Sequence, residues 1–257
     1  LMLAAIAVLP LFFAHFWEKN KNKLIVAGIL SLPIIVYLSS IGNFEHLYDT
    51  LVFDYVPFLI LLGALFIITG GIYIDGDIEA KPIINTIYLA IGAVLASFIG
   101  TTGAAMLLIR PVIKTNKERK YKVHTILFFI GVIANCGGLM TPLGDPPLFV
   151  LYLRGTPFFW FFNLATVWLF VNTLLLLIYY FTDVYFHKKE PKENVVLDKT
   201  QIQPISIKGK VNFLWLLGVV CAVAFINEQY LGFISSNPYF KFLREEIIIT
   251  CAVGSIV

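Results

Sequence analysis

Long apolar runs, separated by short polar or charged segments, dominate the chain. Most of these runs approach or exceed the roughly 20 residues that an α-helix needs to cross the hydrocarbon core of a bilayer. The runs cover 1–16, 24–41, 51–74, 83–113, 123–153, 157–182, 211–227 and 244–257. The pattern predicts an all-α fold, a polytopic transmembrane helical protein.

Two of these runs are too long for one simple helix. Segments 83–113 and 123–153 are each roughly half as long again as a single span, and each carries a polar, glycine-rich break near its middle. The first break reads SFIGTTGA over 97–104, and the second reads NCGGLMTPLGDPP over 135–147. Non-helical backbone at membrane depth is tolerated only where it is buried in protein or lines a water-filled cavity. Two such breaks close together in sequence indicate the binding site of a transporter.

Charge indicates which loops face the cytoplasm. Segment 15–23 has three lysines against one glutamate, 114–122 has five basic residues against one glutamate, and 183–210 has six lysines against four acids. An excess of Lys and Arg marks cytoplasmic loops. We therefore expect all three segments on the cytoplasmic side of a bacterial inner membrane, with 75–82 beside them despite its acidic residues.

This orientation requires a turn inside the membrane. Segments 15–23 and 114–122 share a side only if 83–113 enters and leaves on the same side, so we predict a re-entrant helical hairpin with its tip near Gly100 and Gly103. Segment 123–153 then crosses once as a discontinuous helix. We divide the chain into scaffold helices 1–74, a transport unit 75–182 with a returning helix 157–182, a cytoplasmic linker 183–210, and a truncated second half 211–257.

The second break has the residues of a helix stop followed by a helix start. Asn135 with Gly137 and Gly138 favours a stop, because these residues tolerate left-handed backbone. Asp145 before Pro146 favours a restart, with Asp as N-cap and Pro at the first helical position. By the same reasoning, Thr101 or Thr102 can cap the second arm of the hairpin. Each break would then expose helix ends and free carbonyls, which suit Na⁺ or an anion.

Asp145 is the acidic residue farthest from every predicted membrane surface. The two arms of its broken helix together span about 30 Å, the hydrocarbon thickness, so the break lies near the midplane. An ionised group at that depth costs several kcal/mol and is a functional candidate. Asp145 could bind a proton and a cation alternately, or it could only cap a helix.

We predict an ion or substrate site between the hairpin tip and the broken helix. Its candidate ligands are Thr101, Thr102, Asn135, Thr141 and Asp145. The glycines that would open the two breaks are Gly100, Gly103, Gly137, Gly138 and Gly144. Na⁺ would bind at Asp145 and neighbouring carbonyls. The alternative for the polar side chains is that they only satisfy the backbone of the broken helices.

Composition excludes several classes of protein. Hydrophobic residues make up 59% of the chain and charged residues 14%, against about 45–50% and about 25% in soluble domains. We therefore expect neither a soluble enzyme nor a nucleic-acid-binding protein. The four histidines lie near the ends of spans and no nucleophile–base pattern is visible, so we expect no enzyme activity, no cofactor, and only Na⁺ or H⁺ as coupling ion.

Other polar and aromatic residues have structural interpretations. Trp168 and Tyr179 fit aromatic belts or lipid-facing packing, and Asn172 fits a hydrogen bond between helices. The chain begins at Leu1 and ends at Val257 within an apolar run. We interpret it as the first half of a longer transporter with the start of a second half.

The two breaks carry a family resemblance. GTTGAAMLLIRPVIKTN (100–116) and ANCGGLMTPLGDPPLFVLYLRG (134–155) resemble the ion transporter superfamily of NhaD-type sodium/proton antiporters, arsenite pumps and citrate or dicarboxylate transporters. The branch of citrate transporters or sodium:proton antiporters looks most similar. The resemblance implies a re-entrant hairpin and a broken helix in one half of an inverted repeat, and a homodimer. Thr101, Thr102, Asn135, Thr141 and Asp145 match its site.

The expected function is secondary active transport. We favour sodium/proton antiport, with lipid and a small ion as partners. The alternative within the same class is sodium- or proton-coupled transport of citrate, another small carboxylate, or an arsenite-type anion. The alternative from a different class is a passive channel, because broken helices can also line a pore.

Overall fold

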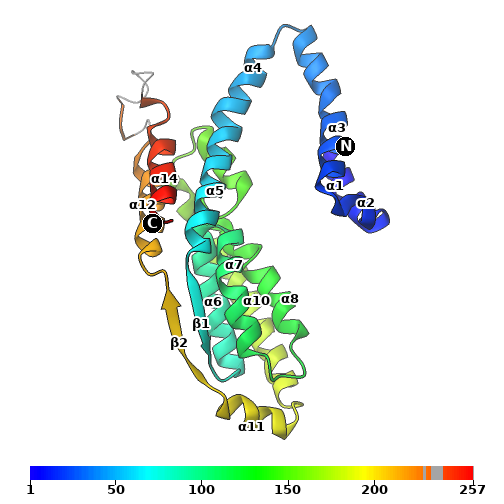
Figure 1. Ribbon diagram of the computed structural model, residues 1–257, viewed down its shortest axis with the longest axis vertical. Coiled ribbons are helices and arrows are strands. Elements are labelled where there is room, and N and C mark those ends of the chain that lie inside the picture. The colour runs from blue at the N-terminus through cyan, green and yellow to red at the C-terminus, as the bar shows by residue number, and fades with distance from the viewer. Residues whose placement is uncertain (228–229, 233–239, 257) are drawn as a thin grey trace. The chain divides into compact units, whose positions relative to one another are not determined.

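The computed structural model describes residues 1–227, 230–232 and 240–256 and consists mainly of helices (Figure 1). It divides into two compact units, Leu1–Val56 and Pro57–Val257. The second unit contains nearly all of α5 (Val56–Gly70) together with the hairpin and the broken helix.

The first unit contains apolar helices that have no core of their own. Its elements are α1 (Met2–Phe12), α2 (Ala14–Glu18), α3 (Asn20–Ser40), α4 (Phe44–Asp49) and the π-helical turn η1 (Thr50–Tyr55). The predicted run 1–16 is interrupted at Phe13, whose φ of −132° and ψ of 48° end α1. Every residue of this unit is exposed or half-buried, as expected for helices that face lipid.

The second unit holds the core and both predicted breaks. It begins with α5, β1 (Tyr73–Asp77), α6 (Pro82–Ile99), α7 (Thr101–Thr115) and α8 (Val123–Val132). It continues with the 3-10 turn η2 (Cys136–Leu139), α9 (Pro146–Leu153), the 3-10 turn η3 (Phe158–Leu164) and α10 (Ala165–His187). It ends with α11 (Lys192–Thr200), β2 (Gln203–Lys208), α12 (Asn212–Phe225) and α14 (Leu243–Gly254).

Helices α6 and α7 form an antiparallel hairpin. At one end, Gly100 joins them with a φ of +80°, a backbone conformation that favours glycine. At the other end, the Asn85 side-chain amide donates to Asn116 Oδ1 over 2.8 Å, and the Asn116 amide donates back over 3.0 Å. The predicted run 83–113 therefore forms two helices, which are joined at Gly100 and linked at their other ends by the Asn85–Asn116 pair.

The predicted run 123–153 is a broken helix, as expected, but its stop differs from our prediction. Helix α8 ends at Val132, before Asn135, which has a φ of −135°. Among the described residues, those with positive φ are Gly42, Gly76, Gly100, Gly155 and Gly209, so neither Asn135 nor the Gly137–Gly138 pair adopts left-handed backbone. The paired glycines instead permit close packing, because a Cβ on Gly137 would lie 2.9 Å from the Ala96 Cβ.

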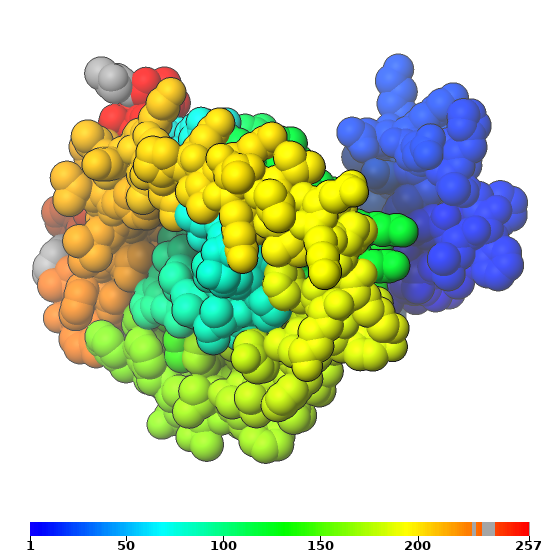
Figure 2. All heavy atoms as spheres, turned by 90° about the horizontal axis from the view of Figure 1, so that it is seen from below, coloured from blue at the N-terminus to red at the C-terminus, as the bar shows by residue number. Residues whose placement is uncertain are grey.

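Two strands and a short helix were not predicted. Strand β1 pairs antiparallel with β2, with Tyr73 opposite Lys208 and Asp77 opposite Gln203, so the described fold is not purely α. The segment 183–210, expected to be a linker, contains the end of α10, all of α11 and all of β2. Figure 2, which looks along the unit from below, shows α11 and β2 (yellow) lying beside the residues of β1 (cyan).

A buried ion-pair network closes the base of the hairpin. Asp183 of α10 is fully buried, and its carboxylate lies 2.6 Å from Arg119 Nη2 and 2.7 Å from His124 Nε2. The Asn85 side-chain amide donates to the same carboxylate over 3.3 Å, and the Tyr179 hydroxyl donates over 3.2 Å. Tyr179 therefore has a buried polar role rather than the aromatic-belt or lipid-facing role that we predicted, and His124, near the end of a predicted span, belongs to the same network.

We expect Arg119→Ala to destabilise the second unit by about 3–5 kcal/mol, because it leaves Asp183 buried without its cation. Lys120→Ala is the matched control, since Lys120 is exposed in the same loop and should change stability by no more than about 0.5 kcal/mol. Denaturant unfolding of the purified protein in detergent measures both effects. Equal midpoints for the two variants would contradict a stabilising role for the network.

Four helical stretches in the described residues are long and apolar enough to cross a membrane. They are Asn20–Ser40, Phe44–Gly70, Pro82–Ile99 and Phe158–His187. Shorter apolar helices cover Met2–Phe12, Val123–Leu139 and Asn212–Phe225. The structure thus agrees with a helical protein that crosses a membrane several times.

Candidate functional site

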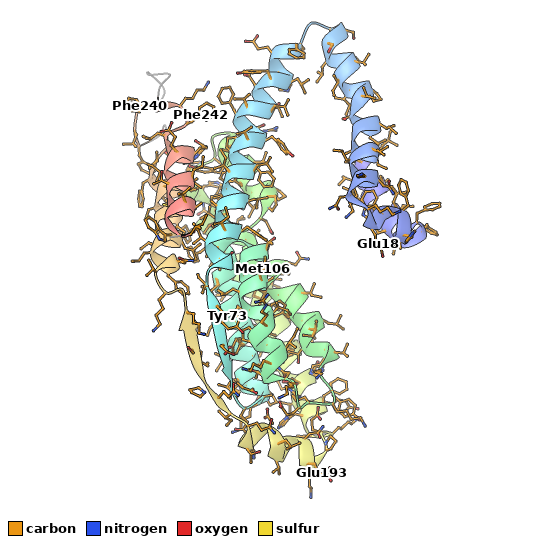
Figure 3. All side chains as sticks on the ribbon, in the orientation of Figure 1. Glu18, Tyr73, Met106, Glu193, Phe240 and Phe242 are labelled. Atoms are coloured by element: carbon orange, nitrogen blue, oxygen red, sulfur yellow. The ribbon has the colours of Figure 1, made fainter. Side chains whose placement is uncertain are left out.

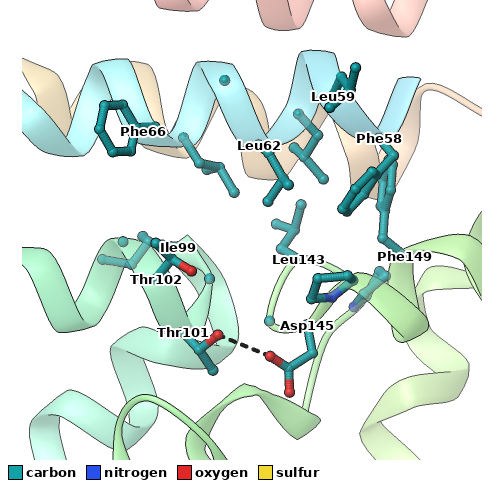
Figure 4. Close-up of a pocket in the computed structure, with 18 residues that line it drawn as sticks. Phe58, Leu59, Leu62, Phe66, Ile99, Thr101, Thr102, Leu143, Asp145 and Phe149 are labelled. Atoms are coloured by element: carbon teal, nitrogen blue, oxygen red, sulfur yellow. Dashed lines mark hydrogen bonds between the residues drawn. The ribbon is translucent and has the colours of Figure 1, made fainter. Parts of the chain in front are cut away.

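The hairpin tip meets the break of the discontinuous helix. Thr101, the first residue of α7, donates its hydroxyl to Asp145 Oδ1 over 2.9 Å (Figure 4). The Thr101 backbone N–H donates to the Gly144 carbonyl over 3.0 Å. Two residues that are 44 positions apart in sequence therefore form one polar contact, which joins the two predicted breaks.

Asp145 occupies the position of an N-cap, but its side chain does not act as one. It directly precedes α9 in extended backbone, and its carboxylate makes no capping hydrogen bond to that helix. Likewise, the residue before α7 is Gly100, and neither Thr101 nor Thr102 caps that helix. Because the Asp145 carboxylate is directed to Thr101, helix capping does not explain its presence.

A second set of contacts fixes the break against the end of α6. Ser97 donates its hydroxyl to the Gly137 carbonyl over 2.5 Å, and the Met140 N–H donates to Ser97 Oγ over 3.3 Å. The Thr141 hydroxyl donates to the Ser97 carbonyl and accepts from the Leu143 N–H over 3.2 Å. Both side chains are fully buried, so they hold the two breaks together.

The two sides of the second break pass each other closely, and this crossing depends on glycines. A Cβ on Gly144 would lie 1.8 Å from the Gly138 carbonyl oxygen, and one on Gly138 would lie 2.7 Å from the Thr101 Cγ2. A Cβ on Gly103 would lie 3.2 Å from the Thr69 Cγ2 of α5. Gly138 and Gly144 therefore allow the two sides of the break to pass backbone against backbone.

Several carbonyls that we expected to be free are already hydrogen-bonded. The Gly137 carbonyl accepts from Ser97 and also from Trp168 Nε1 over 2.9 Å. The Cys136 carbonyl accepts from the Asn172 side-chain amide over 3.3 Å, which confirms the predicted interhelical role of Asn172. Trp168 is therefore not only a lipid-facing residue. Fewer backbone oxygens are left for a cation than the sequence suggested.

The contact between Thr101 and Asp145 borders a pocket of about 400 Å³. Its walls are residues of α5, the hairpin turn and the segment that leads into α9. Figure 4 shows Phe58, Leu59, Leu62 and Phe66 of α5 on one side, with Thr101, Thr102, Leu143, Asp145 and Phe149 opposite. The wall from α5 is apolar, so the polar groups of the pocket lie on the hairpin and the break.

The five predicted ligands lie in different surroundings. Thr101 and Asp145 contact each other at the pocket, and Thr102 also lines it. Thr141 is fully buried and bonded to Ser97. Asn135 is exposed and does not line this pocket. The structure thus brings three of the five to one pocket, whereas Thr141 supports the backbone nearby and Asn135 lies apart.

Sequence reasoning did not identify Ser97 as a support or α5 as a wall. Ser97 was visible as the first polar residue of the first break. The residues of α5 gave no signal, because an apolar wall of a pocket has the same composition as a lipid-facing helix.

Asp145 supplies the one carboxylate among the described residues that line the pocket. In the part of the chain that the structure describes, no group of three or more His, Cys, Asp or Glu side chains could hold a metal ion. A cation at Asp145 would therefore complete its coordination with hydroxyl, carbonyl or water oxygens, which are the ligands that Na⁺ and other hard cations accept.

Comparison with known proteins identifies the family. A search of curated proteins and a search of solved structures gave no match. The family model described as "Putative citrate transport" matches residues 1–257, the full length of the chain. This match confirms the resemblance carried by the two breaks, and it agrees with the several apolar helices. The chain therefore belongs to this family of citrate-type transporters.

Proposed function

We propose that the protein is a secondary active transporter that carries a citrate-like carboxylate together with Na⁺ or a proton. Asp145 is the coupling group. The observation that carries the proposal is the hydrogen bond of 2.9 Å between Thr101 and Asp145 at the pocket between two helix breaks. Membership of the citrate-type family supports the choice of substrate class.

The site offers features for both a cation and an anion. Thr101 occupies one oxygen of the Asp145 carboxylate, and the other oxygen has no hydrogen-bond partner among the described residues. The first turn of α7 begins at the pocket, so the N–H groups of Thr102 and Gly103 lack partners within their own helix. The positive end of a helix dipole favours a carboxylate there.

Charge repulsion gives the coupling. A substrate carboxylate about 4 Å from ionised Asp145 would be repelled by about 4 kcal/mol at an effective dielectric constant of about 20. A proton or Na⁺ on Asp145 removes that repulsion. Substrate therefore binds well only when the cation is bound too, and the gradient of the cation drives uptake.

The second candidate is sodium/proton antiport. It is favoured by the lining of the pocket, which among the described residues contains Asp145 and no Lys, Arg or His. A single carboxylate that exchanges a proton for Na⁺ needs no basic side chain. In this alternative, the coupling ions are the only substrates.

We further propose that the α6–α7 hairpin is re-entrant, with Gly100 inside the membrane and 114–122 and 183–210 in the cytoplasm. Lys114 Nζ lies 2.7 Å from Asp75 Oδ1, which supports one common side for 75–82 and 114–122. An inverted second half and a homodimer would complete the transporter, as the family resemblance implies.

One transport assay separates these functions. The full-length protein is reconstituted in liposomes with an internal pH dye, and Na⁺, Li⁺, labelled citrate or arsenite is added in turn. Citrate uptake that requires a Na⁺ or proton gradient supports the proposal. Proton efflux driven by Na⁺ without citrate establishes the antiporter instead. Dissipation of every gradient without exchange would indicate a channel and overturn both.

A further inference from the structure

The pocket beside Asp145 is apolar over most of its wall. Among the 18 described residues that line it, those with polar side chains are Thr101, Thr102 and Asp145. The others are aliphatic, aromatic, glycine or proline residues. A ligand that fills this pocket therefore places most of its own surface against hydrocarbon, and a few polar groups at one side fix its orientation.

One stripe of α5 forms the wall opposite these polar groups. Its members recur at helical spacing and so share one face of the helix; they are Leu59, Leu62, Gly63 and Phe66. The stripe is about 10 Å long, at about 1.5 Å per residue. In Figure 4 it lies across the pocket from Asp145. An apolar chain can lie along this stripe while a polar end group reaches the hairpin tip.

The stripe leaves room for such a chain beside Gly63. A Cβ built on Gly63 would meet no atom within 4 Å, although this residue lines the pocket. On either side of it, Leu62 is 38% exposed and Phe66 is 55% exposed. Apolar surface is therefore uncovered at the pocket, and a ligand with an apolar body would gain free energy by covering it.

Basic side chains are absent from the described lining of the pocket. The first basic residue of α7 is Arg110, about 14 Å along the helix from Thr101. Helix α11 and its lysines lie at the base of the hairpin, where Figure 3 labels Glu193. Helix α6 places that base about 27 Å from Gly100. A ligand in the pocket is therefore not paired with any of these cations.

The pocket can balance one negative charge on a ligand. With a proton or Na⁺ on Asp145, the N–H groups of Thr102 and Gly103 in the first turn of α7 can hold one carboxylate. A tricarboxylate such as citrate would place its other two carboxylates against the apolar wall of α5. An ionised carboxylate that is buried without a partner is costly, so each additional charge on the ligand weakens binding.

We propose that this pocket prefers a monocarboxylate with an apolar body over a tricarboxylate such as citrate. The carboxylate lies at the start of α7, beside Asp145 in its neutralised form, and the apolar body lies along the stripe of α5. This inference rests on the proposed transport of a carboxylate and narrows its substrate class.

A series of straight-chain acids tests the preference. Acetate, propionate, butyrate and pentanoate carry the same charge and differ by one methylene at each step. Isothermal titration of the full-length protein in detergent, at neutral pH with Na⁺ present, measures the dissociation constant of each acid and of citrate. Titration into detergent alone corrects for partitioning. We expect about fourfold tighter binding for each added methylene, and citrate should bind at least about tenfold more weakly than pentanoate.

Gly63→Leu locates the apolar body of the ligand. The new side chain fills the space along the stripe, so pentanoate should bind at least about tenfold more weakly, whereas acetate should bind nearly as before. Gly131→Leu is the matched control, because a Cβ on Gly131 also meets nothing within 4 Å and Gly131 does not line the pocket. This control should bind every acid of the series like the unmodified protein.

The outcomes separate this inference from the proposed function. Equal affinity along the series, or tighter binding of citrate than of every monocarboxylate, would overturn the preference while carboxylate transport still stands. No binding of any acid, citrate included, would overturn the proposed function as well. The series on the unmodified protein decides the preference even if Gly63→Leu fails to fold.

Discussion

Asp145→Asn is expected to abolish coupled uptake, with a loss of about 100-fold in transport driven by a Na⁺ or proton gradient. The amide oxygen can still accept the hydrogen bond from Thr101, so the contact between the hairpin tip and the broken helix should remain intact. The amide cannot be protonated and has no charge to attract a cation. The attraction between a carboxylate and a cation about 4 Å away is about 4 kcal/mol at an effective dielectric constant of about 20, which is enough to account for the expected loss.

The same variant separates coupling from substrate binding. If Asp145 acts only by repelling the substrate when it is ionised, the uncharged amide should permit exchange of labelled citrate that no longer depends on Na⁺ or pH. Thr101→Ser keeps the hydroxyl and should transport nearly as well as the unmodified protein, whereas Thr101→Val removes it and should weaken cation dependence. Gradient-driven uptake that survives Asp145→Asn would remove this residue from the mechanism.

The sequence was sufficient to predict the two breaks and their neighbours. The lengths of runs 83–113 and 123–153 predicted one hairpin and one broken helix, and the structure has breaks at Gly100 and at 133–145. The positions of the breaks could be predicted because membrane thickness sets the length of a helix and because polar residues inside apolar runs are conspicuous. That the hairpin is re-entrant stays a prediction.

The sequence was a poor guide to how the breaks are held. Ser97 and Trp168 both donate to the Gly137 carbonyl, a convergence from two helices that no local pattern encodes. The strand pair β1–β2 joins segments about 130 residues apart, and short polar strands resemble loops. The ion pair of Arg119 with Asp183 was hidden for a different reason, because both lie in stretches that looked like charged, solvated loops.

Gly144→Ala is expected to prevent correct assembly of the site. The new Cβ would lie 1.8 Å from the Gly138 carbonyl oxygen and 2.5 Å from its carbon, and backbone atoms cannot turn away as a side chain can. Overpacking in a core costs about 1–3 kcal/mol or more, and a backbone clash belongs at or beyond the upper end. Gly144 also gives its carbonyl to the Thr101 N–H, so the clash would displace Asp145 from the hairpin tip.

Gly131→Ala is the matched control, because a Cβ there meets nothing within 4 Å and Gly131 lies inside α8. Alanine in a helix interior is favoured over glycine by about 0.5–1 kcal/mol, so this variant should unfold at a slightly higher temperature than the unmodified protein. Gly144→Ala should unfold at a much lower temperature and lose transport. Opposite changes in unfolding temperature at these two glycines would show that the backbone crossing at Gly144 requires glycine. Similar changes at both would show that the broken helix tolerates alanine in general. Normal transport by Gly144→Ala would mean that the crossing is not needed for function.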